Sequence, residues 1–235
     1  MNTARYDSVA EFYIDGWPDD YSDAVSSSLL SVLGPAAGRK VLDVACGHGR
    51  LTREIARRGA SQVCGLDISE RLIERARLVE ADHHLGIRYV HADVAGSTEF
   101  ADESFDKVSC GFGLSDIDDL QGALTNVARV LVRGGRFAFS ILHPCFPGAD
   151  DISGAWPADA RYYDEQRWHA DGSASSLRRR VSANHRTLST YVNTLAARGL
   201  TIDTMQEPEP GEEWAARCPA GARFPVYLVV GCTKV

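Results

Sequence analysis

The sequence predicts an α/β fold, a mostly parallel sheet of seven strands with helices on both faces. Short apolar runs alternate with amphipathic helical segments along much of the 235-residue chain, which is typical of strands joined by crossover helices. Most of the runs are almost continuously apolar, as expected for strands that are buried on both faces. We expect the strands at residues 40–45, 62–66, 87–91, 105–110, 136–142, 200–205 and 225–231.

Helix boundaries follow from capping residues and from glycine. Ser69 and Glu70 open the clearest helix, because a serine N-cap and an acidic first turn both stabilise a helix N-terminus. Gly59 and Gly199 each end a helical segment, since glycine adopts the left-handed backbone of a helix stop easily. We expect helices near residues 9–13, 22–33, 51–58, 69–83, 118–132 and 187–198, the fifth ending at Gly134 and Gly135.

The length of the chain fits one domain over residues 1–235. We divide it into an N-terminal helical cap (1–38), a central core (39–142), an insertion after the fifth strand (143–184) and a C-terminal helix with strands (185–235). The insertion is irregular, and such long segments in compact domains are usually lids, binding insertions or disordered segments. Its four large aromatic residues weigh against disorder. Its aromatic residues either wall a binding cavity or form a small core of the insertion; they are Trp156, Tyr162, Tyr163 and Trp168.

Composition narrows the classes of partner. The net charge of −7 and the pI of about 5.5 weigh against nucleic acid and anionic membranes, which require basic surfaces. We therefore expect no nucleic-acid or membrane partner, and a monomer or homodimer. The six cysteines form no C-x-x-C pair and no zinc spacing, so we expect no metal. We interpret them as reduced, buried thiols of a cytoplasmic protein.

The most informative motif is the segment VLDVACGHGR, residues 41–50. Asp43 lies near the end of a predicted strand, and Gly47 and Gly49 form a turn that opens a helix. Glycines let the backbone approach a ligand closely, and a helix N-terminus offers free N–H groups. The spacing differs from the dinucleotide fingerprint G-x-G-x-x-G. An acid before the glycines favours a ligand that carries a cation, such as the ammonium group of a sulfonium amino acid.

Two further acids follow predicted strands. Asp67 ends the second strand about 20 residues after the glycine turn, where a carboxylate can accept both hydroxyls of a ribose. Asp93 follows the third strand, where a carboxylate can accept a hydrogen bond from an adenine amino group. Open α/β sheets bind ligands at the carboxyl ends of their strands, so the three acids predict one site. Helix capping or turn formation is the alternative role for each of them.

Five motifs together resemble one family. VLDVACGHG, GLDIS, HADV, FDKVSC and LVRGGRFAF occur in order between residues 5 and 142. They resemble the class I, Rossmann-like S-adenosylmethionine (SAM)-dependent methyltransferases, of the small-molecule type called methyltransferase domain 11/25. The resemblance implies SAM as cofactor, S-adenosylhomocysteine (SAH) as product, and an antiparallel last strand. Ala45 departs from the family, which usually has glycine there; alanine fits if its φ is negative.

The resemblance also implies which residues bind the cofactor. Tyr6 and Tyr13 resemble N-terminal tyrosines that close over SAM, and the backbone at Cys110 resembles the floor under the methionine part. Asp116, Asp118 and Asp119 are interpreted as the start of the following helix. The full set of expected cofactor-binding residues is Asp43, Ala45, Cys46, Gly47, Gly49, Arg50, Asp67, Ile68, Asp93, Val94, Cys110, Tyr6 and Tyr13.

The expected acceptor site lies where the insertion begins. His143 follows the fifth strand and precedes Pro144, so it is our candidate general base and a substrate-binding residue, with a packing role as the alternative. His185, Trp156 and Tyr162 are further candidates for substrate contact. The arginines at 178–180 are interpreted as a solvated run or as part of a lid strand.

These observations predict methyl transfer from SAM to an O, N or C atom of a small molecule, with secondary metabolism as one setting. One alternative is a nucleic-acid or protein methyltransferase on the same core. The sequence Cys110-Gly111-Phe112-Gly113 stands where an Asn/Asp-Pro-Pro-aromatic motif would indicate nucleic acid. A second alternative is a SAM-binding module without catalysis. The missing G-x-G-x-x-G weighs against a dinucleotide oxidoreductase.

Overall fold

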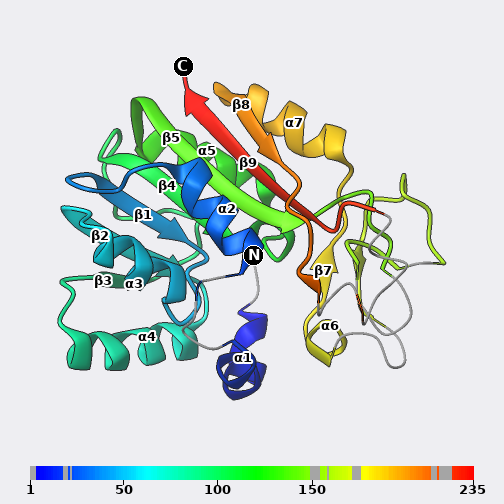
Figure 1. Ribbon diagram of the computed structural model, residues 1–235, viewed down its shortest axis with the longest axis horizontal. Helices are drawn as coiled ribbons and strands as arrows, with labels where there is room; N and C mark the ends of the chain where they lie inside the picture. The colour runs from blue at the N-terminus through cyan, green and yellow to red at the C-terminus, as the bar shows by residue number, and fades with distance from the viewer. Residues whose placement is uncertain are drawn as a thin grey trace.

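The computed structural model describes residues 4–17, 21, 23–148, 154–157, 159–170, 176–212, 216 and 224–235. Within them, seven strands form one sheet in the order β3-β2-β1-β4-β5-β9-β8, as Figure 1 shows. The strands of this sheet are β1 (Lys40–Val44), β2 (Gln62–Asp67), β3 (Arg88–His91), β4 (Phe105–Gly111), β5 (Leu131–Leu142), β8 (Leu200–Gln206) and β9 (Tyr227–Lys234).

The sheet has the predicted mixed direction. β1 pairs in parallel with β2 and β4, and β4 with β5, whereas β9 runs antiparallel to both β5 and β8. The Rossmann-like fold with an antiparallel last strand is therefore confirmed. Asp43 lies opposite Gly65 of β2 and Ser109 of β4, and the last residue of β2 is Asp67, so the register brings two of the three acids to one edge.

Helices cover both faces of the sheet. One apolar core joins α2 (Ala24–Leu33), α3 (Arg50–Arg57) and α4 (Glu70–His83) to the face that α2 crosses in Figure 1. A second core joins α5 (Leu120–Val130) and α7 (Leu188–Ala196) to the other face. The predicted N-cap of α4 is confirmed, because the Ser69 hydroxyl accepts a hydrogen bond from the backbone N–H of Leu72 at 3.2 Å.

One predicted boundary is wrong. We expected a helix as far as residue 132 and a strand from residue 136, but α5 ends at Val130 and β5 begins at Leu131. Gly134 and Gly135 therefore lie inside the strand, where β4 and β5 also shift register. A Cβ on Gly135 would lie 2.7 Å from the carbonyl oxygen of Val132, so this glycine permits a tight bend in the strand.

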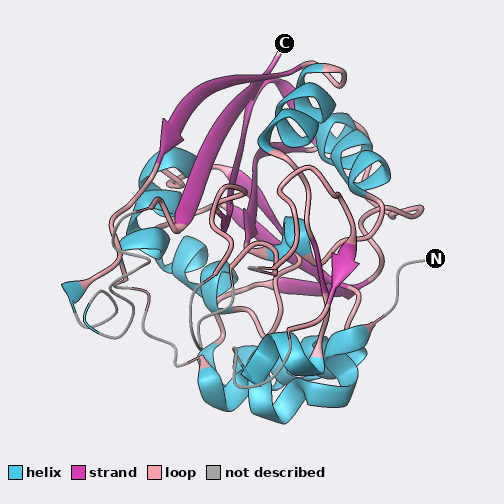
Figure 2. Ribbon diagram, turned by 90° about the vertical axis from the view of Figure 1, so that its right-hand side faces the viewer, coloured by secondary structure: helices cyan, strands magenta, loops and turns pink. Residues whose placement is uncertain are grey.

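The N-terminal cap and the insertion lie beyond the carboxyl ends of the parallel strands (Figure 1). The predicted cap of residues 1–38 is divided in the structure, because α2 packs on the sheet. We keep the name cap for the 3₁₀ helix η1 (Arg5–Val9) and α1 (Ala10–Gly16). The insertion contains β6 (Arg167–Trp168), α6 (Ser176–Arg180) and β7 (Ala183–Asn184), and β6 and β7 pair antiparallel. Figure 2 shows the short strand of the insertion among loops, apart from the main sheet. We call the described residues of the range 143–186 the lid; it extends two residues beyond the predicted insertion.

The cysteines follow the prediction only in part. Cys64, Cys110 and Cys232 are buried and Cys46 is half-buried, but Cys145 is exposed at the start of the lid. The sixth cysteine, Cys218, lies outside the described residues. Among the residues described, the helices are all too short or too polar to pass through a lipid bilayer.

Candidate cofactor and acceptor site

A cavity of about 790 Å³ opens at the carboxyl ends of the parallel strands. Strand ends and the loops that follow them form its floor. The cap contributes Tyr6 and Tyr13 to its walls, and the lid contributes Leu177 and Arg178. The residues that line it include the predicted cofactor residues Asp43, Ala45, Cys46, Gly47, Arg50, Asp67, Ile68, Asp93, Val94, Tyr6 and Tyr13.

Asp43 is a buried acid held by two hydroxyl groups. Its carboxylate accepts hydrogen bonds from Thr52 of α3 at 2.7 Å and from Ser109 of β4 at 2.8 Å. Burial raises the pKa of Asp43 to about 7, although both hydroxyls act in the opposite direction. A buried carboxyl of this kind is stabilised as the anion when a cation lies beside it.

Asp67 links the glycine turn to β2. One carboxylate oxygen accepts the backbone N–H of Gly47 at 2.8 Å, and the other accepts that of Ser69 at 2.8 Å. Burial raises the pKa of Asp67 to about 6, and the two N–H groups oppose this shift. Each oxygen keeps acceptor capacity beyond its one bond, so a pair of ligand hydroxyls fits this carboxylate.

The turn between β1 and α3 is left-handed at three positions. Gly47 and Gly49 have φ values of +56° and +87°, and Ala45 has +53°. The condition of a negative φ at Ala45 is therefore not met, and its methyl group is tolerated at a cost in backbone strain. The loop after β4 leaves space for this methyl group, because it has a glycine, Gly113, at the point of contact. A Cβ on Gly113 would lie only 2.4 Å from the methyl carbon of Ala45.

Aromatic rings of the cap pack over the turn. Tyr6 and Tyr13 meet edge to face with ring centroids 5.1 Å apart, and Tyr13 meets the His48 ring in the same way at 5.6 Å. Arg50, at the start of α3, lies within 5.5 Å of the Trp17 ring and 5.1 Å of the Tyr21 ring. Burial raises the pKa of both Tyr6 and Tyr13, so their hydroxyls stay neutral donors.

Two predicted cofactor residues are not in the cavity lining. The side chain of Cys110 is buried below it, while the next three residues, Gly111, Phe112 and Gly113, line it with their backbone and the Phe112 ring. Gly49 lies behind the lining, against Tyr89; a Cβ there would lie 2.3 Å from the Tyr89 hydroxyl oxygen. The sequence placed Gly49 by the family motif, and its role in the structure is to let the turn pack on β3.

His143 also lies outside the cavity lining. Its Nδ1 accepts the backbone N–H of Cys145 at 3.1 Å, and its Nε2 lies 3.0 Å from Oε1 of Glu207. Burial lowers the pKa of His143, and Glu207 opposes that shift. Because both ring nitrogens are engaged, the described geometry favours the packing role over the role of general base.

The other predicted acceptor residues form a cluster of their own inside the lid. The Trp156 ring lies 5.7 Å from that of His185 and 6.4 Å from that of Tyr162. Backbone groups complete the cluster, since His185 Nε2 lies 2.7 Å from the Tyr162 carbonyl oxygen and the Tyr162 hydroxyl accepts the Leu188 N–H at 2.9 Å. None of the three lines the cavity. Their arrangement matches the alternative of a small core within the insertion.

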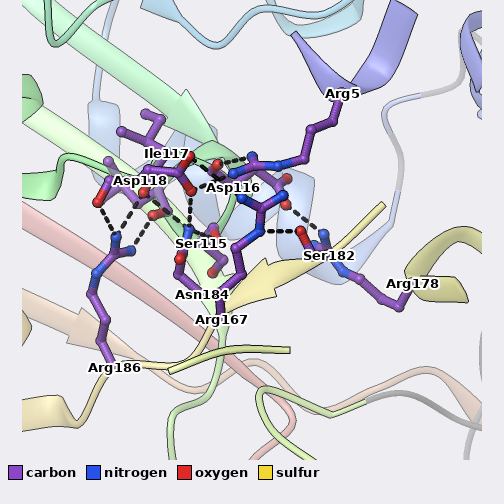
Figure 3. A network of polar contacts seen from close by, with 11 residues as sticks. Arg5, Ser115, Asp116, Ile117, Asp118, Arg167, Arg178, Ser182, Asn184 and Arg186 are labelled. Atoms are coloured by element: carbon purple, nitrogen blue, oxygen red, sulfur yellow. Dashed lines mark hydrogen bonds and ion pairs between the residues drawn. The ribbon is translucent and has the colours of Figure 1, made fainter. Parts of the chain in front are cut away.

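Sequence reasoning missed the polar network of Figure 3. Of the three acids interpreted as a helix start, only Asp119 caps α5, where it accepts the Gly122 N–H at 2.8 Å. For Asp116 and Asp118 that interpretation is wrong, because they bind arginines of the cap and lid. Arg178 is buried and lines the cavity, which excludes a solvated run at this position. Three acidic residues after a strand do not by themselves predict that two of them bind arginines of the cap and the lid.

One stretch of the cavity wall is apolar. Phe112 and Tyr227 meet edge to face with ring centroids 6.0 Å apart. Leu142 at the end of β5 and Val226 just before β9 continue this surface. The cavity therefore has an acidic part, beside the glycine turn, and an apolar part, beside β5 and β9.

Residues 42–139 match the family model described as a methyltransferase domain. This part of the chain is similar to a methyltransferase domain, and it contains most of the parallel strands of the sheet. It is 41% identical over 106 residues to a demethylmenaquinone methyltransferase of Tropheryma whipplei, and 35% over 111 residues to a ubiquinone biosynthesis O-methyltransferase of Alkalilimnicola ehrlichii. These matches cover 45% and 47% of this chain but only 42% and 44% of the relatives, so the matched part spans less than half of either.

A solved structure extends the likeness to most of the chain. The SAM-dependent methyltransferase from Mesorhizobium loti is 29% identical, with a TM-score of 0.73, over 91% of this chain and 99% of that one. Asp43 and Asp67 place buried carboxyl groups, which suit cationic and hydroxyl groups, beside the glycine turn. The turn is closely covered by the cap, because a Cβ on Gly47 would lie 3.4 Å from the Tyr13 ring.

Proposed function

We propose that the protein transfers a methyl group from SAM to a small molecule with an apolar, ring-containing skeleton. The observation that carries this proposal is the convergence of Asp43, Asp67 and Asp93 on one cavity at the strand ends of a methyltransferase domain. SAM supplies an electrophilic methyl group on a sulfonium. Both named curated relatives are quinone-pathway enzymes by their names, which fits an apolar ring as acceptor.

Each half of the cavity has its own task. Asp43 balances the charge of the ammonium group of the amino-acid part, and Asp67 accepts the ribose hydroxyls. Asp93, whose Oδ1 also accepts the Ala95 N–H at 2.9 Å, orients the adenine. Phe112 and Tyr227 hold the acceptor ring by edge contacts. Tyr6 and Tyr13 exclude water from the reacting groups.

Alignment supplies most of the rate in this proposal. Holding two reactants in attack geometry contributes about 7–11 kcal/mol of the barrier in well-oriented systems. The acceptor atom is an oxygen, nitrogen or carbon, as predicted from the sequence. A base is needed for a hydroxyl acceptor and little for a neutral amine, and His143 serves as one only if the lid rearranges.

Calorimetric titration with SAH tests the proposal. We expect micromolar binding to the wild-type protein and none of NAD. Asp67→Ala removes the acceptor of the ribose hydroxyls, and we expect it to weaken SAH binding by about 1.5–3 kcal/mol. Asp164→Ala is a matched control, because Asp164 lies in the lid outside the cavity lining. Absence of SAH binding, or equal affinity of the Asp67 variant, would contradict the proposed cofactor site.

A further inference from the structure

The side chain of Asp116 touches both walls of the cavity. Asp116 follows the 3₁₀ helix η2 (Gly113–Ser115), in the loop between β4 and α5, and it lines the cavity. The hydroxyl of Tyr6, in the cap, donates a hydrogen bond to its Oδ2 at 2.9 Å. The guanidinium of Arg178, in the lid, donates to its Oδ1. One carboxylate therefore joins two segments that are 172 residues apart in the chain.

The contacts beside Asp116 repeat this pattern (Figure 3). Asp118 binds Arg5 of the cap and accepts the side-chain N–H of Asn184, in the lid, at 3.0 Å. Arg5 also donates to the backbone carbonyl of Asp116 at 2.9 Å. From the lid, Arg186 donates to the carbonyls of Ile117 and Asp118 at 2.7 and 2.9 Å. Residues 116–118, which we call the hub, thus anchor the cap and the lid together.

Burial gives this arrangement energetic weight. The side chains of Arg178 and Asp116 are 10% and 18% exposed, so their ion pair is shielded from water. Removing one partner of such a pair leaves a poorly solvated charge, which is costly. When the Tyr6 hydroxyl donates to Asp116, the carboxylate is already oriented to accept from Arg178. In the same way, the contact with Arg178 orients the carboxylate for Tyr6. Ordering one wall therefore lowers the entropic cost of ordering the other.

We propose that Asp116 is a positioning residue that couples closure of the cap over the cofactor to closure of the lid over the acceptor. The proposal rests on the function proposed above. Tyr6 of the cap and Leu177 and Arg178 of the lid all line the cavity. A ligand that orders the cap thereby favours the ordered lid, so cofactor binding prepares the acceptor pocket. Such coupling is reciprocal for binding free energies.

A thermodynamic cycle tests the coupling. SAH dissociation constants are measured by calorimetry for Tyr6→Phe, Arg178→Gln and the double variant. Each single variant raises the SAH dissociation constant by some factor. If Asp116 transmits the coupling, the factor for the double variant is smaller than the product of the two single factors, by at least about threefold, which is within the usual range for interacting residues. When Asp116→Asn is also present, we expect the two factors to multiply to within a factor of about 1.5. If they already multiply in the protein that retains Asp116, the proposal is overturned.

Hydrogen exchange provides a readout that a purely structural role would not move. SAH should slow amide exchange in the cap (5–16) and in the lid (176–186) of the wild-type protein. In Asp116→Asn we expect protection of the cap to persist and protection of the lid to be lost. Asp119→Asn is the matched control, because Asp119 caps α5 outside the cavity lining and asparagine caps equally well.

The outcomes separate this proposal from the proposed function. Equal protection of the lid amides by SAH in Asp116→Asn and in the wild type would overturn the coupling. Faster lid exchange in Asp116→Asn without ligand would also overturn it, if SAH still slows that exchange by the wild-type factor. Failure of the wild-type protein to bind SAH at all would instead contradict the proposed function. Binding of SAH with protection of both segments only when Asp116 is present would establish the positioning role.

Discussion

The acidic part of the cavity and its lid wall are built by different means. In the acidic part, Asp67 and Gly47 are 20 residues apart and joined by a carboxylate-to-backbone bond, and the register of neighbouring strands places both. At the lid wall, Asp116 is 110 residues from Tyr6 and 62 from Arg178, and side chains alone make the bonds. A site specified by backbone topology is readable from a short motif, whereas one specified by distant side chains is not.

The energetics of the two parts differ in the same way. Strand register is set by an entire sheet, so a single side chain cannot easily move the acidic part. The lid wall depends on a few hydrogen bonds and ion pairs between loops, and local openings of such regions cost much less than global unfolding. The comparison predicts steep effects for changes in the turn beside β1, and mild effects for changes in the lid outside the buried Arg178–Asp116 pair.

The largest expected effect comes from Gly49→Ala. The added Cβ would lie 2.3 Å from the Tyr89 hydroxyl oxygen at a residue with φ of +87°. Overpacking and left-handed strain together should lower the free energy of unfolding by about 2–4 kcal/mol, measured by urea denaturation. Gly211→Ala is the control, since it makes the same substitution at a glycine where a Cβ has no neighbour within 4 Å.

A second variant sharpens this test. Tyr89→Phe removes the oxygen nearest to the added Cβ but keeps the ring, whose Cζ would still lie 2.8 Å away. We expect Gly49→Ala/Tyr89→Phe to recover part of the lost stability but not all of it. A loss below about 1 kcal/mol for Gly49→Ala alone would show that the turn yields easily, and the contrast with the lid would disappear.

The mostly parallel sheet and the acidic part were predictable for a common reason. Apolar runs, glycines and the acids at strand ends act locally, so the strand positions and the placement of Asp43 and Asp67 followed from motifs. The antiparallel direction of β9 was implied by the family resemblance alone. The start of β5 was not predictable, because Gly134 and Gly135 look like a helix stop but serve a bend in the strand.

The lid wall was beyond sequence reasoning for a different reason. His185 and Arg178 are residue types that suit a binding site, and only packing decides that His185 turns into the lid and Arg178 into the cavity. The contacts of Asp116 depend on Tyr6 and Arg178, which are far apart in the chain and meet only in the fold. No local spacing encodes such a meeting, so a single sequence leaves it open.

A medium effect is expected from pH. Accepting ribose hydroxyls requires ionised Asp67, whose pKa is raised to about 6 in the free protein, and balancing an ammonium group requires ionised Asp43, with a pKa of about 7. Below these values protons compete with the ligand. The affinity for SAH should therefore fall as pH decreases from 8 to 5, by at least about tenfold.

The pH experiment also tests the assignment to single residues. SAH dissociation constants are measured at constant ionic strength for the wild type and for Asp67→Asn, which keeps the shape of the side chain but does not titrate. The variant should bind more weakly at pH 8, and its remaining decrease should occur near pH 7, where Asp43 titrates. A wild-type affinity that is constant from pH 8 to pH 5 would separate these carboxyls from the ligand.

The smallest expected effect concerns His143, at the start of the lid. His143→Gln removes the Nδ1 acceptor of the Cys145 N–H and the contact with Glu207, so we expect it to lower the free energy of unfolding by about 1 kcal/mol. Since His143 is outside the cavity lining, the SAH dissociation constant and kcat should stay within a few-fold of the wild type. The measurements are urea denaturation, calorimetry and SAH release with any acceptor that is turned over. A general base would give the opposite pattern, with kcat lower by about 100- to 10,000-fold and SAH affinity unchanged. That result would mean that the lid rearranges to bring His143 to the acceptor, and that the lid wall contributes to the chemistry as well as to closure.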